Sequence, residues 1–252
     1  MTPRREPPGS LVVAGRRPVL EALEAGAVIE VLVDDATRAR GGLEPILSAA
    51  RSRDVRVRPI ARGSLEAMAP DVPHQGVAAR IGAPPELAEA DLGDRRWGPD
   101  DVVVALDGVT DPRNVGAVAR TAEAAGAAAL VLRRRRGAGV TTVALKSSAG
   151  ALLHLPVARV ANVPRALGRL RSAGFWVVGL DERAEVEIGG SERPPGRLAV
   201  VLGSEGAGLS RLVRASCDEL LSIPMRGRVS SLNVAVAAGV ALFAYALRPT
   251  TP

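Results

Sequence analysis

Residues 221–247 constrain the architecture of this chain most strongly; they read Leu-Ser-Ile-Pro-Met-Arg-Gly-Arg-Val-Ser-Ser-Leu-Asn-Val-Ala-Val-Ala-Ala-Gly-Val-Ala-Leu-Phe-Ala-Tyr-Ala-Leu. A short apolar run ends at Pro224, which cannot donate a hydrogen bond to a sheet and so predicts the end of a strand. After a loop with two arginines, Ser230 or Ser231 offers a hydroxyl to cap a helix that begins near Leu232. Because this helix contains almost only Val, Ala, Leu and Gly, we expect it to be buried on more than one side. Taken alone, the Ser-Ser-Leu-Asn cluster is also explained as an N-cap followed by a solvated asparagine.

The composition predicts a globular, arginine-rich protein without an aromatic stacking surface. Of the 252 residues, 47% are apolar and 24% are charged, which suffices for one large or two modest domains with real cores. Aromatic residues make up only 2%, too few for the series of stacked rings that many single-strand binders use. The formal net charge is +6, and every cationic side chain except Lys146 is an arginine. Nucleic acid is therefore a natural partner, although a GC-rich genome would also favour Arg over Lys.

Cysteine and histidine are too scarce for a disulfide framework or a zinc site. Cys217 is the single cysteine, so no intramolecular disulfide can form and a cytoplasmic location is expected. With only His74 and His154 beside it, no metal is expected. The final apolar helix approaches a membrane-spanning length, but its many Ala and Gly residues suit a packed helix better, so no membrane partner is expected. Residues 1–10 are rich in Pro, Arg and Gly, which predicts a disordered leader.

Residues 11–81 are expected to form a small N-terminal α/β domain. Pro18 near the start and Gly26 at the end delimit its first helix, and Arg16 and Arg17 put positive charge on the preceding loop. The predicted helices are residues 15–26, 43–53 and 64–69, and the predicted strands are residues 28–33, 55–59 and 74–81.

A linker and a larger domain follow. Residues 82–99 contain two adjacent prolines, an acidic run and a Trp-Gly-Pro sequence, a composition typical of a linker. The second domain, residues 100–252, begins with the apolar run 102–106, which suits a strand buried on both faces of a sheet. Helical segments such as residues 162–173 alternate with strands, so we expect an α/β fold with a mostly parallel sheet and helices on both faces. The further predicted strands are residues 128–132, 155–157, 175–179, 198–202 and 220–223.

The first motif, residues 107–126, follows a buried strand and opens a helix. Asp111 is the expected N-cap, Pro112 the first helical residue, and Gly126 lies beyond the helix end.

A stripe of three residues runs along this helix. Arg113, Gly116 and Arg120 are spaced to share one side, so a ligand would be able to approach the backbone at Gly116 between two guanidinium groups. The alternative is a surface pair of Arg120 with Glu123 beside a tolerated glycine.

The second motif is Val-Leu-Gly-Ser-Glu-Gly-Ala-Gly-Leu-Ser, residues 201–210. A predicted strand runs into a loop with three glycines, which permit positive φ and a close approach of the backbone to a ligand. The spacing differs from the dinucleotide fingerprint, and Glu205 would repel a pyrophosphate. A cofactor of another kind is favoured.

Together with Ile-Pro-Met and Ser-Ser-Leu-Asn-Val in residues 223–234, these motifs closely resemble one family, the SpoU class of RNA ribose 2′-O-methyltransferases. The three motifs have the order and spacing of that family, and the resemblance covers residues 102–247. The front of the chain, with Gly-Arg-Arg-Pro-Val-Leu-Glu-Ala-Leu at 15–23 and His-Gln-Gly-Val-Ala at 74–78, resembles the branch that methylates a guanosine ribose in 23S ribosomal RNA.

The resemblance implies a fold, a cofactor and partners. The C-terminal sheet would contain a deep trefoil knot, a rare exception to the absence of knots in proteins, and S-adenosylmethionine would lie bent within it. The N-terminal domain would be a ribosomal-protein-like RNA-binding fold. The protein would act on RNA as a homodimer, with the last helix in the interface between the C-terminal domains.

The resemblance also implies roles for individual residues. The expected catalytic residues are Arg120, Asn114, Glu205, Ser231 and Asn233. The expected cofactor-binding residues are Leu202, Gly203, Gly206, Ile223, Met225 and Leu232. The expected RNA-binding residues are Arg16, Arg17 and Arg113.

The expected reaction is an in-line attack of a ribose 2′-oxygen on the sulfonium methyl group, for which positioning would supply on the order of 7 kcal/mol. Arg120 is the family's usual candidate base, but a guanidinium is effectively always protonated. We therefore prefer Arg120 as an electrostatic stabiliser of the developing alkoxide, with Glu205 orienting it and with Ser231 and Asn233 fixing ribose or cofactor. His154 is the alternative base, although it lies outside the three motifs.

Two other functions are compatible with the sequence. A transfer RNA or another ribosomal site, including one modified by resistance-type enzymes, would be served by the same three motifs. A non-catalytic RNA-binding protein with a degenerate pocket is a second alternative, and S-adenosylmethionine binding would distinguish it from an enzyme.

Overall fold

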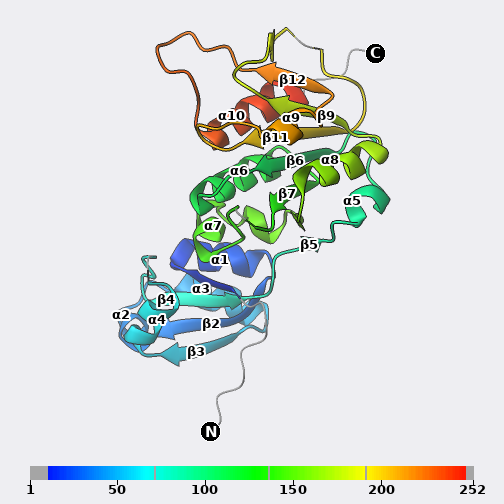
Figure 1. Ribbon diagram of the computed structural model, residues 1–252. Helices are drawn as coiled ribbons and strands as arrows, with labels where there is room; N and C mark the ends of the chain where they lie inside the picture. The colour runs from blue at the N-terminus through cyan, green and yellow to red at the C-terminus, as the bar shows by residue number, and fades with distance from the viewer. Residues whose placement is uncertain (1–10, 71, 136, 191, 248–252) are drawn as a thin grey trace.

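The computed structural model describes residues 11–70, 72–135, 137–190 and 192–247, so the expected leader at 1–10 lies outside the described residues. Within them the chain forms one sheet of four strands and one of eight. In Figure 1 the small sheet, blue to cyan, and the large sheet, green to orange, belong to two separate domains. No helix in these ranges is long and apolar enough to cross a membrane.

The N-terminal domain is the small α/β unit that the sequence predicts. Its strand order is β1-β4-β2-β3, in which β4 runs antiparallel to both of its neighbours and β2 and β3 are parallel. Its elements are β1 (Leu11–Ala14), α1 (Arg16–Glu24), β2 (Val28–Asp34), α2 (Asp35–Arg40), α3 (Glu44–Ser52), β3 (Arg56–Ile60), α4 (Arg62–Met68) and β4 (Val77–Ile81).

The C-terminal domain confirms the predicted α/β fold. Its strand order is β10-β12-β9-β11-β6-β7-β8-β5, and every pairing in it among the described residues is parallel. Its strands are β5 (Glu86–Leu87), β6 (Val102–Asp107), β7 (Ala129–Arg133), β8 (Val157–Val160), β9 (Trp176–Leu180), β10 (Val186–Glu187), β11 (Leu198–Gly203) and β12 (Glu219–Ser222). Its helices are α5 (Asp91–Asp94), α6 (Pro112–Ala124), α7 (Thr142–Ser147), the 3-10 turn η1 (Ala151–Leu153), α8 (Val163–Ser172), α9 (Arg211–Arg214), α10 (Val234–Ala241) and the π-helical turn η2 (Leu242–Ala246). The trefoil knot stays a prediction.

Strand β6 is buried on both faces because its side chains alternate between two cores. Val104 and Leu106 belong to the core under α6 and α10, whereas Val103 and Ala105 belong to the core under α8. The continuous apolar run therefore fills both sides of the sheet, as expected for a central parallel strand.

The predicted helix boundaries of α6 and α8 are confirmed. Asp111 accepts a hydrogen bond of 2.8 Å from the backbone N–H of Arg113, and Pro112 is the first residue of α6. Asn162 caps α8 in the same way, with 2.9 Å to the N–H of Arg165. Both helices end at a glycine with positive φ, which closes them sharply.

Two local predictions are wrong. The strand predicted at 155–157 is displaced to β8, because the N–H of Leu155 completes the turn after η1 by donating to the carbonyl of Ala151. The last helix is capped by Asn233, whose Oδ1 accepts from the N–H of Ala235 at 2.9 Å, and not by Ser230 or Ser231. A side-chain amide at this position satisfies the first helical N–H groups, so the two serines stay in the loop.

The segment expected as a linker, residues 82–99, packs on the C-terminal domain. It contributes strand β5 at the edge of the large sheet and helix α5. Leu92 is fully buried, and the ring of Trp97 lies edge-on to Phe175 at a centroid distance of 5.2 Å. Residues 87, 92 and 97 of this segment therefore belong to the hydrophobic core between the large sheet and α8.

Gly116 has a structural use that differs from the expected one. A Cβ at this position would lie 2.0 Å from Ser147 Oγ and 2.3 Å from the carbonyl oxygen of Ala144, both on α7. The stripe between Arg113 and Arg120 is thus closed at Gly116 by a neighbouring helix of the same chain, and the space expected for a ligand is filled. Because α7 also packs against β1, this contact links α6 to the N-terminal domain.

We predict that Gly116→Ala destabilises the protein by about 1–3 kcal/mol or more, since backbone of α7 would have to move. The measurement is the free energy of unfolding in denaturant. Gly168→Ala on α8 is the matched control, because a Cβ there meets no atom within 4 Å. This variant should gain up to about 1 kcal/mol from helix propensity. Equal effects of the two substitutions would contradict the close packing of α6 and α7.

Candidate functional site

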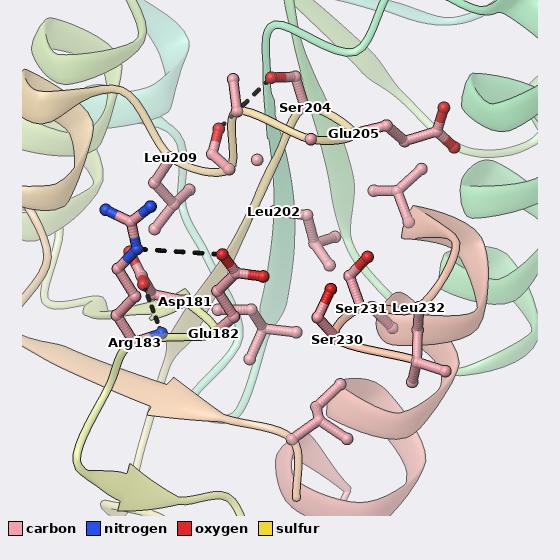
Figure 2. A pocket seen from close by; sticks show the side chains of 18 of the residues that line it. Asp181, Glu182, Arg183, Leu202, Ser204, Glu205, Leu209, Ser230, Ser231 and Leu232 are labelled. Atoms are coloured by element: carbon pink, nitrogen blue, oxygen red, sulfur yellow. Dashed lines mark hydrogen bonds and ion pairs between the residues drawn. The ribbon is translucent and has the colours of Figure 1, made fainter. Parts of the chain in front are cut away.

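A cavity of about 430 Å³ lies at the carboxyl ends of three neighbouring strands, β9, β11 and β12. Its walls are residues 180–183 after β9, residues 202–209 after β11, and parts of the segment 221–237 (Figure 2). This is the edge of a parallel sheet at which ligands bind, and the volume is that of a small-molecule site.

The structure brings most of the predicted site residues to this cavity. All six residues expected to bind a cofactor line it, namely Leu202, Gly203, Gly206, Ile223, Met225 and Leu232. Glu205, Ser231 and Asn233 of the expected catalytic set line it as well. In Figure 2 the hydroxyl groups of Ser230 and Ser231 and the side chain of Leu202 face the same hollow. Apolar side chains, hydroxyls and loop backbone together suit a nucleoside-like ligand.

The glycine-rich loop folds back on its own strand. Ser204 and Gly208 exchange two backbone hydrogen bonds, of 3.1 and 2.9 Å. A Cβ on Gly203 would lie 2.1 Å from the carbonyl carbon of Gly208, so any side chain at Gly203 would break the turn. Gly206 and Gly208 have positive φ angles of 79° and 64°. Glycine is therefore required at these positions for the tight turn of the loop that lines the cavity.

Asp107 fixes this loop, a role that the sequence analysis missed. It is the last residue of β6 and is buried, and its Oδ2 accepts a hydrogen bond of 2.8 Å from the N–H of Ser210. The signal was the position of Asp107 at the start of the first motif, immediately after a buried strand.

Three polar side chains from the three motifs form one hydrogen-bonded cluster at the rim of the cavity. Asn114 Nδ2 donates to Glu205 Oε1 at 2.7 Å. Asn233 Nδ2 donates to Glu205 Oε1 and to Asn114 Oδ1, both at 3.0 Å. We call these residues the amide–carboxylate cluster. The charge-assisted bonds hold the start of α6, the glycine-rich loop and the start of α10 together.

Asn233 does two jobs in this cluster. Its Oδ1 caps α10, whereas its Nδ2 makes the two bonds to the other motifs. A side chain with an acceptor alone would serve the cap but not the cluster. The residue type at this position therefore follows from tertiary contacts as well as from helix capping.

We predict that Asn233→Asp keeps the helix cap but loses the cluster, because a second carboxylate would face Glu205 in place of a donor. The free energy of unfolding should fall by about 1 kcal/mol or less, because these groups are exposed. The rate of the methyl transfer that the motifs imply should fall at least tenfold, because the cluster would no longer hold its groups in position.

The matched control for this substitution is Asn162→Asp, since Asn162 caps α8 and makes no second contact of this kind among the described residues. Thermal unfolding measures the stability of both variants, and the rate of the methyl transfer that the resemblance of the motifs implies measures their activity. A wild-type rate of methyl transfer for Asn233→Asp would show that the hydrogen bonds from Asn233 Nδ2 to Asn114 and Glu205 are dispensable.

Arg120 does not join the cluster. It is exposed on α6, six residues and so about 240° around the helix from Asn114, and it does not line the cavity. Within the described part of the chain the hydrogen-bond partners of Glu205 are the two asparagines, so the orientation of Arg120 by Glu205 stays a prediction. The alternative pair of Arg120 with Glu123 is likewise not formed there, and His154 lies outside the cavity lining.

The loop after β9 supplies cavity residues that the sequence analysis did not identify. Asp181 Oδ1 accepts from the N–H of Arg183 at 2.9 Å and lies 3.0 Å from Arg214 Nη2. Glu182 has its carboxylate directed into the hollow in Figure 2 and lies 3.9 Å from Arg183 Nε. The available signal was position alone, because this loop follows a strand at the carboxyl edge of the sheet.

The three expected RNA-binding arginines lie at different places. Arg113 is exposed at the first turn of α6. Arg16 lines a hollow of the N-terminal domain with Arg62 and His74, whereas Arg17 is paired with Glu21 at 2.9 Å. Among the described residues no group of three or more His, Cys, Asp or Glu side chains is arranged to hold a metal ion.

Comparison with known proteins matches two families to two parts of the chain. The SpoU rRNA Methylase family matches residues 101–243, and the RNA 2′-O ribose methyltransferase substrate-binding family matches residues 12–87. An uncharacterized tRNA/rRNA methyltransferase of Mycobacterium avium is 41% identical over 239 residues, which are 91% of this chain and 75% of that protein.

Two further proteins carry more specific names. The 23S rRNA (guanosine-2′-O-)-methyltransferase RlmB of Photobacterium profundum is 41% identical over 202 residues, 80% of this chain and 82% of that protein. The crystal structure of the SpoU methyltransferase AviRb from Streptomyces viridochromogenes, in complex with the cofactor AdoMet, has a TM-score of 0.75 and 31% identity, and covers 93% of this chain and 88% of that chain.

The fold and the site thus define a two-domain enzyme of the RNA methyltransferase class, with a cavity built from the glycine-rich loop and the start of α10. Within that class, the chain belongs to the SpoU rRNA methylase family, because that family's model matches more than half of it.

Proposed function

We propose that this protein transfers a methyl group from S-adenosylmethionine to the 2′-hydroxyl of a guanosine ribose in 23S ribosomal RNA. The observation that carries the proposal is the cavity with the amide–carboxylate cluster at its rim. The name of the Photobacterium relative and the substrate-binding family at residues 12–87 support the RNA substrate. An RNA substrate also favours the cytoplasm as the place of action.

The residues of the cavity suit the parts of this cofactor. The apolar side chains of Leu202, Ile223 and Leu232 would cover the adenine ring. The loop backbone around Gly203 would form hydrogen bonds with the polar edge of that ring. Glu182 places a carboxylate where ribose hydroxyls or the ammonium group of the cofactor can donate to it. When bound, S-adenosylmethionine supplies an activated methyl group, and the protein supplies position and charge.

The amide–carboxylate cluster would position the ribose that receives the methyl group. Glu205 Oε1 already accepts two N–H bonds, so its second oxygen is the one available to a ribose hydroxyl. Fixing the hydroxyl at the rim of the cavity would lower the entropic part of the barrier.

The test is methylation of unmodified transcripts with isotopically labelled S-adenosylmethionine, followed by mapping of 2′-O-methyl groups. We expect modification of one guanosine in a 23S ribosomal RNA transcript. Modification of a transfer RNA transcript instead would contradict the proposed substrate but would leave the proposed reaction unchanged. No binding of S-adenosylmethionine in calorimetry would favour the non-catalytic alternative.

A homodimer closed through α10 is part of the proposal. Val236, Phe243 and Leu247 lie on one side of the last helix and are 52%, 54% and 45% exposed. Three of the small residues of this helix do not face that side: Ala238 and Ala241 are buried, and Gly239 faces Thr121 of α6. The small size of these three serves packing within the chain. A second copy that covers the three large side chains would bury an isologous apolar patch.

We predict that Phe243→Glu prevents self-association, because the carboxylate would be buried without a partner in the interface. Leu212→Glu is the control, since Leu212 is 56% exposed on α9, away from this stripe. Sedimentation should show a monomer for the first variant and a dimer for the second. Because the cavity segment leads directly into α10, the monomer should also bind S-adenosylmethionine at least several-fold more weakly. A wild-type protein that sediments as a monomer would refute the interface.

The dimer also gives Arg120 a place to act. Arg120 is exposed next to Thr121, the residue of α6 that Gly239 faces, so Arg120 lies on the helix against which α10 packs. We propose that in a dimer closed through α10 Arg120 reaches the cavity of the partner subunit, since it does not line the cavity of its own chain. There it would stabilise the developing alkoxide or hold the adjacent phosphate.

We predict that Arg120→Ala lowers the methylation rate at least a hundredfold and leaves the affinity for S-adenosylmethionine within a few-fold of wild type, because Arg120 does not line the cavity of its own chain. Arg120→Lys should also be slow, since a point charge does not reproduce a planar fork. Mixing Arg120→Ala with a cofactor-deficient Gly203→Ala chain should restore activity in the mixed dimers. A mixture without restored activity would place Arg120 and the cavity in the same subunit.

A further inference from the structure

Residues 124–180 contain eight arginines and Lys146 but no Asp or Glu. Nine positive charges in this segment, against a net charge of +6 for the whole chain, leave a net charge of −3 on all other residues. The segment comprises β7, α7, η1, β8, α8 and β9. Residues 124–180 therefore account for the whole positive net charge of the protein.

Part of this charge is neutralised by acids from other segments. Arg165 pairs with Glu89, and Arg171 pairs with Asp218 at 3.0 Å. Five other arginines of the segment form no ion pair with any described residue. One of them, Arg169, lies on α8, whereas the other four are exposed or half-exposed at the carboxyl ends of β7 and β8. These four, which we call the basic strip, are Arg133, Arg134, Arg135 and Arg159.

The basic strip is held in place by the sheet. The N–H of Arg134 donates to the carbonyl of Val160 at 2.7 Å, which extends the pairing of β7 with β8 by one residue. Arg134 Nη2 donates to the carbonyl of Arg159 at 3.1 Å. Residues at the ends of paired strands are less mobile than a free loop, so the guanidinium groups are presented at a fixed edge.

This edge is the one that carries the site. All strands of the large sheet are parallel, so the carboxyl ends of β7 and β8 lie on the same side as those of β6 and β11. The N–H of Ala138 donates to the carbonyl of Val109 at 2.9 Å, which ties the loop after β7 to the loop that precedes α6 and Asn114. With strands about 4.8 Å apart, β7 and β8 lie about 10 and 15 Å from β11.

Charge changes sign along this edge. On the far side of β11, the loop after β9 carries four acidic residues within seven positions, Asp181, Glu182, Glu185 and Glu187, and one arginine. The sheet order thus runs from an acidic end at β9, past the amide–carboxylate cluster, to the basic strip at β7 and β8. A polyanion would be repelled from the cofactor side and attracted to the other side.

We infer that the basic strip binds phosphates of the substrate RNA next to the target nucleotide, on the side of the amide–carboxylate cluster away from the cofactor. This inference rests on the proposed function and adds a direction for the RNA across the catalytic domain. The contacts would be to the backbone, so they would position the strand without reading its bases.

The test compares two adjacent pairs of exposed arginines. Arg134→Ala/Arg135→Ala removes half of the basic strip. The matched control is Arg95→Ala/Arg96→Ala, which removes the same charge just before β6, where the carbonyl of Trp97 is bound by Arg197 at the start of β11. These residues lie at the amino edge of the sheet. Thermal unfolding and calorimetry with S-adenosylmethionine should show both variants folded and with unchanged cofactor affinity.

The readout is binding and methylation of the transcript that the wild-type protein modifies, at several salt concentrations. We expect the Arg134→Ala/Arg135→Ala variant to bind RNA about tenfold or more weakly and to have a raised KM at an unchanged kcat. The slope of log Kd against log salt should fall by about 1.4, since each contact to a single-stranded phosphate contributes about 0.7. The control pair should differ from wild type by less than about twofold.

Equal losses in the two variants would show an effect of net charge and overturn the inference. An unchanged KM and salt slope for Arg134→Ala/Arg135→Ala would overturn it as well, while leaving the proposed function intact. A wild-type protein that binds S-adenosylmethionine but methylates no RNA would instead refute the proposed function, and the inference with it.

Discussion

The structure depends on the parallel pairing of β6 with β11. In the register of this pair, Asp107 stands opposite Gly203, so the ends of two strands that are about a hundred residues apart in sequence meet at one edge. The carboxylate of Asp107 then binds the N–H of Ser210 and fixes the glycine-rich loop. Because β6 is buried on both faces, the pair cannot shift without exposing apolar side chains. The position of the cavity follows from this register.

Small residues let the backbone segments around the site approach one another closely. Gly203 allows the loop after β11 to fold back on its own strand, and Gly116 allows α7 to lie against α6. Ala238 and Gly239 do the same for α10 against the sheet and α6. A protein with 2% aromatic residues has few large side chains with which to fill gaps, so it builds its core by bringing backbones together.

Charge is arranged along the sheet edge in the order in which the reaction would need it. The cavity side carries carboxylates, and the centre holds neutral amides around Glu205. The far side carries arginines that form no ion pair with any described residue. A cofactor with an ammonium and a sulfonium group would meet the first, and a polyanionic RNA would meet the last. The two substrates of a transfer reaction would thereby be guided to opposite sides of the same few side chains.

The sequence by itself determined the α/β fold, the parallel sheet, the caps of α6 and α8 and the family, because apolar periodicity, capping residues and loop glycines act over short stretches of chain. Through the resemblance of its motifs it also named nine of the residues that line the cavity, but none in the loop after β9. Only the tertiary structure decided what Gly116 contacts, that Asn233 caps α10 while bonding two other motifs, that Glu205 is held by amides instead of by Arg120, and that Glu182 faces the cavity. Each of these depends on which distant strand ends become neighbours, and local sequence signals carry no information about that distance.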